Sequence, residues 1–343
     1  MSETVSLSLP ETEELCFAAA LGVGAGADAA CSIARAAVAA EADGQPAVGL
    51  SHFLDYLHGF RDGRIAAGAM PVLTRPLPAI FKSDAGGGVA HLGFDLAFEE
   101  LASAAGKLGV AVFAQSNAYT CGSLGYFAGR LAERGLVALA ATNGPALMAG
   151  SGSTRPVYCT NPLAFAAPGP DGVALLIDQA SSATAFVNIR AAAARGEPIP
   201  EGWAIDGDGN PTTDPVRAME GALLAFGGAR GANVALMVEV LAAGLTGANW
   251  SLDAPSFSEG SESPGSGLFV LALAPELLQP DFCTRLERQI DRLSDEYGVH
   301  IPGRMRQAQR SRAAEAGLTV PRAIVQELEK AAAAGRALGP QPG

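Results

Sequence analysis

Apolar residues recur at helical spacing through the first sixty positions of the chain. Residues 6–40 follow this pattern, and the carboxylates directly after Pro10 are typical of the first turn of a helix. A second, alanine-rich helix is predicted over residues 27–42, and a third over residues 51–60, which ends near Gly63. The N-terminal part of the chain is therefore expected to be helical.

The pattern changes in the centre of the chain, where short apolar runs are bounded by Gly, Pro, Asn and Asp. Runs of this kind predict strands, here at residues 110–113, 137–141, 164–167, 174–177 and 268–273. Helical periodicity separates the first two runs and returns later, at residues 124–134, 234–243 and 282–295. Helices at both ends around a strand-rich centre indicate an α/β protein built on a mixed sheet.

Glycine-rich segments do not carry a dinucleotide fingerprint in this chain. No Gly-x-Gly-x-x-Gly motif opens a strand–helix unit, and residues 22–26 and 86–88 do not follow a convincing strand. An ordinary Rossmann domain is therefore not supported. Residues 259–266 are expected to form a Gly/Ser/Pro-rich loop, and residues 331–343 a loose tail.

Composition narrows the class of protein further. Of the 343 residues, 49% are hydrophobic and 17% are charged, which is enough for a sizeable core and gives little sign of disorder. The net charge of −12 argues against a surface for nucleic acid or anionic membranes. Residues 1–10 lack a signal-peptide pattern, and the most apolar stretch, residues 234–247, is too short to span a bilayer. We expect a cytoplasmic protein.

The cysteines and histidines do not form a metal-binding or disulfide pattern. The five cysteines are scattered, odd in number and without a Cys-x-x-Cys pair, at Cys16, Cys31, Cys121, Cys159 and Cys283. The four histidines are not at metal-ligand spacing. Reduced thiols and no structural metal are expected.

A set of short motifs between residues 116 and 250 resembles one enzyme family in order and spacing. Each motif alone is common, but together they match the malate/L-lactate/sulfolactate dehydrogenase-like family, which includes Δ1-pyrroline-2-carboxylate and Δ1-piperideine-2-carboxylate reductases. The matching segments are residues 121–126, 135–137, 142–143, 160–162, 177–182, 199–203, 211–215, 227–231 and 238–247. The likeness extends less tightly to both ends of the chain.

The resemblance implies a fold class and an assembly. It implies a mixed-sheet α/β domain of non-Rossmann type that binds NADPH or NADH, a helical domain built from both termini, and a homodimer. On this view residues 1–75 form the N-terminal part of the helical domain. Residues 76–250 form the cofactor domain, and residues 251–343 pack back on the helical domain.

Two histidine-bearing motifs of the family are altered in this sequence. The family's Ser-His-His-Phe-Gly block falls at Ala118-Tyr119-Thr120-Cys121-Gly122, which contains no histidine. The early Ser-His-Gly-x-x-Arg block is placed at residues 47–52, so that Val48 replaces its histidine and His52 its arginine. The histidine that family dehydrogenases use as acid/base on a hydroxyl group is missing in this alignment.

The candidate catalytic residues are Ser51, His52 and Asp178. Asp178 falls at the family's aspartate position, where it would orient a proton donor or interact with a protonated imine. The alternative for Asp178 is a strand-end carboxylate that caps the turn at residues 181–182. His52 titrates near neutral pH when unperturbed, so it can supply a proton or bind a carboxylate. A satisfied histidine on a helix face is the equal alternative.

The candidate cofactor-binding residues come from three segments. Tyr119, Thr120, Cys121, Gly122 and Ser123 are expected to form the loop beneath the cofactor, where Gly122 permits close backbone approach. Thr160, Asn161 and Pro162 match the turn that meets the nicotinamide or ribose. Arg230 lies between glycines where the family has lysine, and a guanidinium there can bind a phosphate group. The alternative for residues 119–123 is a simple strand-to-helix turn. The alternative for Arg230 is a cation at the start of a helix.

These residues favour reduction of a cyclic 2-imino acid, because an iminium brings its own proton while a ketone must obtain one. The expected reaction converts Δ1-pyrroline-2-carboxylate or Δ1-piperideine-2-carboxylate to proline or pipecolate. Two alternatives remain open. One is a 2-hydroxy acid dehydrogenase for malate, lactate, sulfolactate or ureidoglycolate, and the other is a catalytically silent relative that binds a nucleotide.

Overall fold

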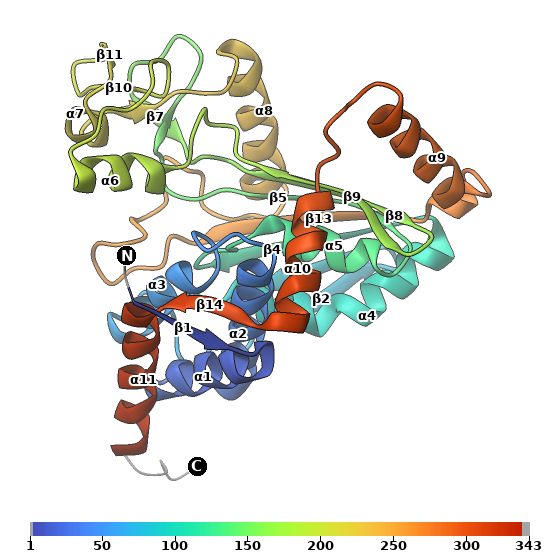
Figure 1. Cartoon of the computed structure of the whole chain (residues 1–343), viewed down its shortest axis with the longest axis horizontal. Coiled ribbons are helices and arrows are strands. Elements are labelled where there is room, and N and C mark those ends of the chain that lie inside the picture. Colours follow the sequence, from blue (N-terminus) through green and yellow to red (C-terminus); the bar gives the residue numbers. More distant parts are fainter. Residues whose placement is uncertain (1–2, 338–343) are drawn as a thin grey trace.

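A seven-stranded mixed sheet forms the centre of the protein, which we describe from a computed structural model over residues 3–337 (Figure 1). The strand order is β2-β3-β4-β13-β5-β8-β9, and only β3 and β4 pair in parallel. The strands are β2 (Val72–Leu77), β3 (Ile80–Asp84), β4 (Val110–Ala118), β13 (Ser266–Leu273), β5 (Val137–Thr142), β8 (Leu163–Gly169) and β9 (Gly172–Gln179). All five strands predicted from the apolar runs are present.

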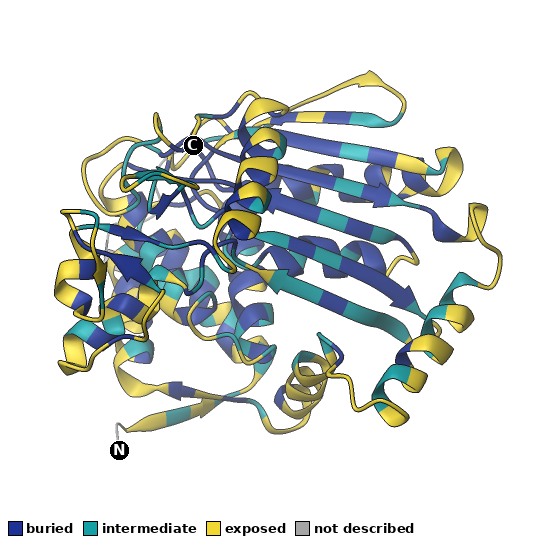
Figure 2. Ribbon diagram, turned by 90° about the horizontal axis from the view of Figure 1, so that it is seen from above, coloured by how far each residue is buried: buried dark blue, intermediate teal, exposed yellow. Residues whose placement is uncertain are grey.

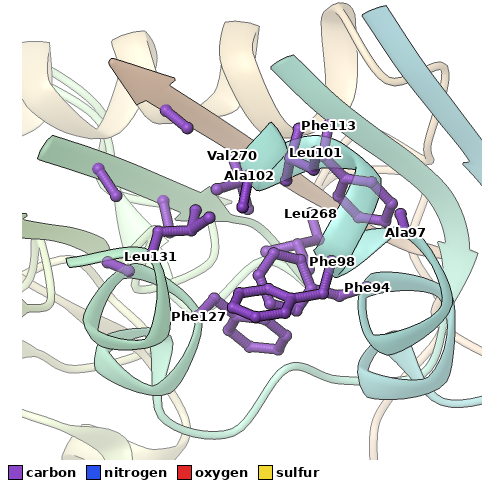
Figure 3. Close-up of a cluster of buried hydrophobic side chains, with 14 of the residues drawn as sticks. Phe94, Ala97, Phe98, Leu101, Ala102, Phe113, Phe127, Leu131, Leu268 and Val270 are labelled. Atoms are coloured by element: carbon purple, nitrogen blue, oxygen red, sulfur yellow. The ribbon is translucent and has the colours of Figure 1, made fainter. Parts of the chain in front are cut away.

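Helices α4 (Ala90–Leu108) and α5 (Leu124–Ala132) cover one face of this sheet. Alanine occupies four neighbouring positions of one cross-strand row beneath them, from Ala111 through Ala272 and Ala138 to Ala166. Small side chains let the helices approach closely, and aromatic rings fill the space between them (Figure 3). Phe94 of α4 and Phe127 of α5 meet edge to face, with ring centroids 5.1 Å apart.

The other face of the sheet is covered only in part. Helix α8 (Ala229–Glu239) and the π-helical turn Val240–Gly244 cross it and bury Ala141 and Phe269. Beyond this helix no other helix crosses the middle of the face in the view of Figure 2. The next cross-strand row consists of large apolar side chains that stay half-buried, namely Ile80, Val112, Leu271, Leu139, Phe165 and Ile177.

The two ends of the chain meet in a helical domain, as predicted. Helices α1 (Leu9–Gly22), α2 (Ala27–Ala42), α3 (Leu50–Arg61) and α11 (Arg322–Ala337) share one hydrophobic cluster. Helices α1 and α11 approach so closely that a Cβ atom on Gly335 would lie 2.6 Å from the Cα atom of Gly22. Beside them, β1 (Thr4–Leu7) pairs with β14 (Leu318–Pro321).

Three local predictions need correction. Residues 6–7 belong to strand β1, and the first helix begins only after Ser8, whose side chain caps it in a capping box with Glu11. Residues 331–337 continue helix α11 instead of forming a loose tail, and residues 338–343 lie outside the described part of the chain. The glycines at 86–88 do follow a strand, because β3 ends at Asp84.

That glycine turn joins β3 to α4, but the chain itself fills the space around it. The Ala66 N–H group donates to the Gly87 carbonyl, and the Gly87 N–H group donates to the Asn117 carbonyl. A Cβ atom on Gly88 would lie 2.9 Å from the Cβ atom of Ala69. The turn therefore serves close packing within the βαβ unit formed by β3, α4 and β4.

A smaller five-stranded sheet projects from the edge of the large one. Its order is β11-β10-β12-β6-β7, and it packs with α6 (Phe186–Arg195), α7 (Pro215–Met219) and the start of α8. The strands are β6 (Met148–Ala149), β7 (Pro156–Tyr158), β10 (Ala204–Ile205), β11 (Pro211–Thr212) and β12 (Ala222–Leu223).

The C-terminal region completes the chain with α9 (Phe282–Asp295), at the predicted residues, and α10 (Arg304–Ala316). A short 3-10 helix, Pro275–Leu277, leads from β13 toward α9. Within residues 3–337, none of the helices is long and apolar enough to cross a lipid bilayer.

Candidate active site

The segments predicted to form the site come together at one edge of the large sheet. Strands β4, β5 and β9 end there, and β8 begins there. The Thr142 N–H group donates to the Pro162 carbonyl over 3.4 Å, and the Ser181 N–H group donates to the Thr160 carbonyl over 2.8 Å. Four segments far apart in the sequence, at residues 119–123, 142–144, 160–162 and 180–182, thus form one continuous rim.

His52 projects from α3 toward the first of these segments. Its Nε2 atom lies 2.9 Å from the Thr120 hydroxyl oxygen, and its Nδ1 atom lies 3.0 Å from an Asp55 carboxylate oxygen. The Tyr56 hydroxyl oxygen is 3.1 Å from the same Thr120 oxygen. Because His52, Asp55 and Tyr56 are spaced three and four residues apart, one helix face presents all three side chains.

Asp55 stays ionised beside this imidazole. Burial raises its pKa, but the hydrogen bond from His52 and the positive charges of His52, Arg190 and His58 outweigh burial, so the pKa lies below its ordinary value. An ionised Asp55 accepts a hydrogen bond from the Nδ1–H group of His52. The Nε2 atom then faces Thr120 or a ligand.

This geometry favours another alignment for the early family motif. When the motif is moved four residues along, its Ser-His pair coincides with Ser51-His52, and Phe53 and Tyr56 replace its glycine and arginine. His52 contacts the loop at 119–123, whereas Val48 precedes α3 altogether. A histidine is therefore present beside the loop, although the loop contains none.

The backbone of this loop approaches α3 closely at Gly122. Gly122 has a φ of 58°, which favours glycine, and a Cβ atom there would lie 3.5 Å from the Tyr56 hydroxyl oxygen and 3.8 Å from Cδ2 of His52. His91 lies on the other side, with its Nε2 atom 3.9 Å from that position. Burial lowers the pKa of His91 to about 4, so it is a neutral ring that packs against Phe127.

Two side chains of the loop point into the core. The Tyr119 side chain is buried, and its hydroxyl group donates to the Phe257 carbonyl over 2.8 Å. The Cys121 sulfur lies 3.2 Å from the Thr142 hydroxyl oxygen, and burial raises the thiol pKa to about 12. Both residues anchor the loop in the core, and Thr120 is buried against α3, which leaves Gly122 and Ser123 as the half-buried members of the loop.

Asp178 holds the far end of the same loop. One carboxylate oxygen accepts hydrogen bonds from the Gly125 N–H group at 3.0 Å and the Ser123 hydroxyl at 3.1 Å, and Arg306 of α10 lies 3.3 Å from it. Gly125 is the second residue of α5, so a carboxylate here stabilises the helix N-terminus. Asp178 therefore caps α5, not the turn at residues 181–182.

Ser51 and Asp178 lie apart from the cluster formed by His52, Asp55, Tyr56 and Thr120. Ser51 is exposed on α3, and its hydroxyl has no hydrogen-bond partner among residues 3–337. Asp178 reaches the cluster only through Ser123 and the intervening loop. Arg306 is a partner of Asp178 that sequence reasoning missed, because a contact across 128 positions leaves no local pattern.

The turn at residues 160–162 is fastened to helix α8. Asn161 has a φ of 38° and is fully buried, and its amide nitrogen donates to the Ala235 carbonyl at 2.9 Å and to Glu239 at 2.7 Å. Glu239 also accepts hydrogen bonds from the backbone and the hydroxyl of Ser251. Asn161 is thus a structural residue, and half-buried Thr160 and Pro162 form the accessible part of the turn.

The N-terminus of α8 has the properties of an anion site. Gly228 is its N-cap with a φ of 64°, and no side chain caps the first N–H groups. Arg230 is exposed in the first turn and makes no ion pair within the described residues. Gly231 is required here because a Cβ atom would collide with the Phe226 carbonyl. These groups fit the phosphates of a nicotinamide dinucleotide.

Comparisons with known proteins show which family the sequence resembles. The sequence profile described as malate/L-lactate dehydrogenase matches residues 7–329. The chain is 38% identical over 323 residues to a (2R)-3-sulfolactate dehydrogenase (NADP(+)) of Chromohalobacter salexigens, covering 94% of this chain and 96% of that protein. It is 35% identical over 347 aligned positions to a Δ1-pyrroline-2-carboxylate reductase of Ancylobacter novellus, covering 99% of both.

A solved structure matches the fold over nearly the whole chain. It is the crystal structure of Δ1-piperideine-2-carboxylate reductase from Pseudomonas syringae, with a TM-score of 0.91 and 30% sequence identity. The match covers 96% of this chain and all of the other one.

The Asp178→Asn variant tests the capping role. The change keeps the side-chain volume but removes the charge that Arg306 and the α5 N-terminus share, so we expect a loss of about 1–2 kcal/mol of stability. Thermal unfolding measures this loss, with Asp171→Asn in the β8–β9 turn as control. A melting temperature equal to that of the parent, together with lost turnover, would instead make Asp178 a group that acts in the reaction.

Proposed function

The chain belongs to the malate/L-lactate dehydrogenase family, and we propose that it reduces a cyclic 2-imino acid to the corresponding cyclic amino acid. The family resemblance and the mixed-sheet fold are confirmed, and the protein is a nicotinamide-dependent oxidoreductase. The proposed substrates are Δ1-pyrroline-2-carboxylate and Δ1-piperideine-2-carboxylate. Relatives named for these substrates align with the chain over almost its full length.

The composition of the loop at 119–123 is the observation that carries this proposal. The loop places the buried Thr120 hydroxyl group beside His52 and a bare backbone at half-buried Gly122, and no imidazole comes from the loop itself. A protonated imine needs no acid at its nitrogen when hydride reaches its carbon, because the positive charge is neutralised in that step. When bound, the reduced nicotinamide supplies the hydride.

His52 then serves to hold the substrate. Nδ1 of His52 lies against the Asp55 carboxylate, and when the imidazole is protonated it attracts the carboxylate that all 2-imino acids carry. Thr120 and Tyr56 fix the ring from the other side, so the cation is oriented before substrate binds. Thr160, Pro162, Gly122 and Arg230 are the residues proposed to hold the cofactor.

The His52–Asp55 pair also favours a second candidate, reduction of a 2-oxo acid to a 2-hydroxy acid. An imidazole oriented by a carboxylate is a common general acid, and a ketone reaction needs one as charge develops on oxygen. The relative from Chromohalobacter salexigens is named for such a reaction.

Substrate competition decides between the two candidates. We expect kcat/KM for Δ1-pyrroline-2-carboxylate to exceed that for pyruvate, oxaloacetate and sulfopyruvate by about 10²–10⁴-fold, the usual contribution of a positioned acid. Cofactor absorbance in steady-state assays with NADPH and then NADH measures both rates. A faster 2-oxo acid reaction would refute the imine proposal.

The His52→Gln variant separates the two roles of the histidine. If His52 binds the carboxylate, KM for the imine rises while kcat changes little. If His52 is the proton donor, kcat falls and a 2-oxo acid is the better substrate of the parent enzyme. His58→Gln is the matched control, because His58 is exposed on the same helix.

The Arg230→Ala variant tests the proposed phosphate contact. Loss of one charge-assisted contact should raise the cofactor dissociation constant by about tenfold or more, equivalent to about 1.4 kcal/mol. Fluorescence titration with NADPH measures it, and Arg288→Ala on α9 is an exposed control. An unchanged dissociation constant would remove Arg230 from the cofactor site.

We also propose that the protein is a homodimer, joined through the partly covered face of the large sheet. The half-buried row from Ile80 to Ile177 spans six strands, about 25 Å, and the exposed side of α8 adds Leu236, Met237, Val240 and Leu245. A charge-poor contact also suits two copies with a net charge of −12 each.

A charge on this face should separate the copies. The Leu236→Glu/Met237→Glu double variant is expected to sediment as a monomer, while the parent sediments as a dimer. Leu278→Glu, at an even more exposed apolar residue away from α8, is the control. A parent that sediments as a monomer, or a dimeric double variant, would contradict the proposed interface.

A further inference from the structure

Residues 251–265, which we call the strap, run across the rim of the candidate site between the π-helical turn and β13. One end is fixed at Ser251, which binds Glu239 and accepts a hydrogen bond from the Cys159 N–H group at 3.1 Å. The other end is held by the Asn249 amide, which donates to the Pro264 carbonyl at 3.0 Å. Between these ends the strap reaches the helical domain.

The middle of the strap is held there by a buried arginine, Arg64, which follows α3. Arg64 is 5% exposed, and one terminal nitrogen lies 3.3 Å from the carbonyl oxygens of both Ser258 and Gly260. Its other terminal nitrogen pairs with Asp62 at 2.8 Å, while the Nε atom has no partner among the described residues.

A buried guanidinium with an unsatisfied N–H group is costly for stability, and an apolar side chain would fill the same space more cheaply. What an apolar residue lacks is the set of donors for two backbone carbonyls at once. The contacts of Arg64 are therefore best understood as fixing the strap, not as strengthening the core.

The strap places Phe257 on the rim. Its ring lies against Gly144, just after the end of β5, where a Cβ atom would be 2.5 Å from the ring. Its carbonyl accepts the hydroxyl of Tyr119, the residue that precedes Thr120. Arg64 also lies close enough to Tyr119 to offset part of the rise in hydroxyl pKa that burial causes. Arg64, Phe257 and Tyr119 thus connect the strap to the loop at 119–123.

We propose that Arg64 is a positioning residue for the reaction. It acts through the strap, by holding Phe257 over the ends of β4 and β5 so that the loop at 119–123 keeps its geometry and water is excluded from the rim. This inference rests on the proposed location of the site at that loop, but not on which acid is reduced.

The test uses Arg64→Met, which keeps an unbranched stem and removes the donors, with Arg61→Met as control. Arg61 is exposed three residues earlier and has no ion pair within residues 3–337. Hydrogen exchange at residues 257–260 should become faster in Arg64→Met alone. With whichever acid the parent reduces, kcat should fall about tenfold to a hundredfold, while KM and the cofactor dissociation constant change less than about threefold.

The Tyr119→Phe variant gives a second, milder route to the same contact, since it removes the hydroxyl group that donates to the Phe257 carbonyl and leaves Arg64 in place. Combined with Arg64→Met, its effect on kcat should be less than multiplicative, because both variants free one strap. Unchanged exchange in Arg64→Met, or faster exchange with unaltered kcat, would overturn the proposal. If Arg64→Met does not fold, Tyr119→Phe takes its place as the test. Unchanged hydrogen exchange and unchanged kcat in Tyr119→Phe would then overturn the proposal.

The exchange measurement needs no substrate. A parent enzyme that reduces no cyclic imine would therefore refute the proposed substrate and leave the strap measurement valid.

Discussion

The loop at 119–123 is held from two sides, and the candidate site depends on that double attachment. On one side Thr120 contacts His52 and Tyr56 of the helical domain, and on the other Asp178 binds Ser123 and the start of α5. The loop backbone turns through a left-handed conformation at Gly122, which glycine adopts without strain, and the contacts on the two sides fix its position. These contacts fix the position of the helical domain relative to the large sheet at the point where a substrate would bind.

Much of the fold follows from local pattern, and the exceptions have physical causes. Apolar runs identified five of the seven strands of the large sheet, because each of these is long enough to be bounded by turn residues, and they missed β2 and β3. The small sheet was not predicted, since two-residue strands such as β6 and β12 carry no periodicity. The turn at 86–88 was misjudged because the preceding strand, with Lys82 and Asp84 in it, alternates in burial and lacks an apolar run.

The site was harder to predict than the fold, because its key contacts join distant segments. The sequence predicted which loops form the site, and the structure brings those loops to one edge of the large sheet. The sequence could not show that Tyr119 and Cys121 point inward, because side chains in an irregular loop do not follow a regular alternation. Arg306 and Arg64 left no local signal for the same reason, as each acts on residues more than a hundred positions away. His52 was a candidate from the sequence, and aligning the motif four residues later would also have placed it at the family's histidine position.

The two candidate reactions differ in what they ask of a single hydrogen bond. In the parent geometry Nε2 of His52 is engaged with the Thr120 hydroxyl, which in turn meets Tyr56. A ketone reaction requires Nε2 of His52 to turn its proton from Thr120 to the substrate oxygen. The hydrogen bond to Thr120, worth about 0.5–1.5 kcal/mol, must then be exchanged for a new one in the transition state. An imine reaction leaves the bond in place and uses only the charge of the ring. Thr120 therefore has no effect on imine reduction but opposes ketone reduction. For this reason the replacement of a family histidine by Thr120 favours the imine, even though His52 lies beside it.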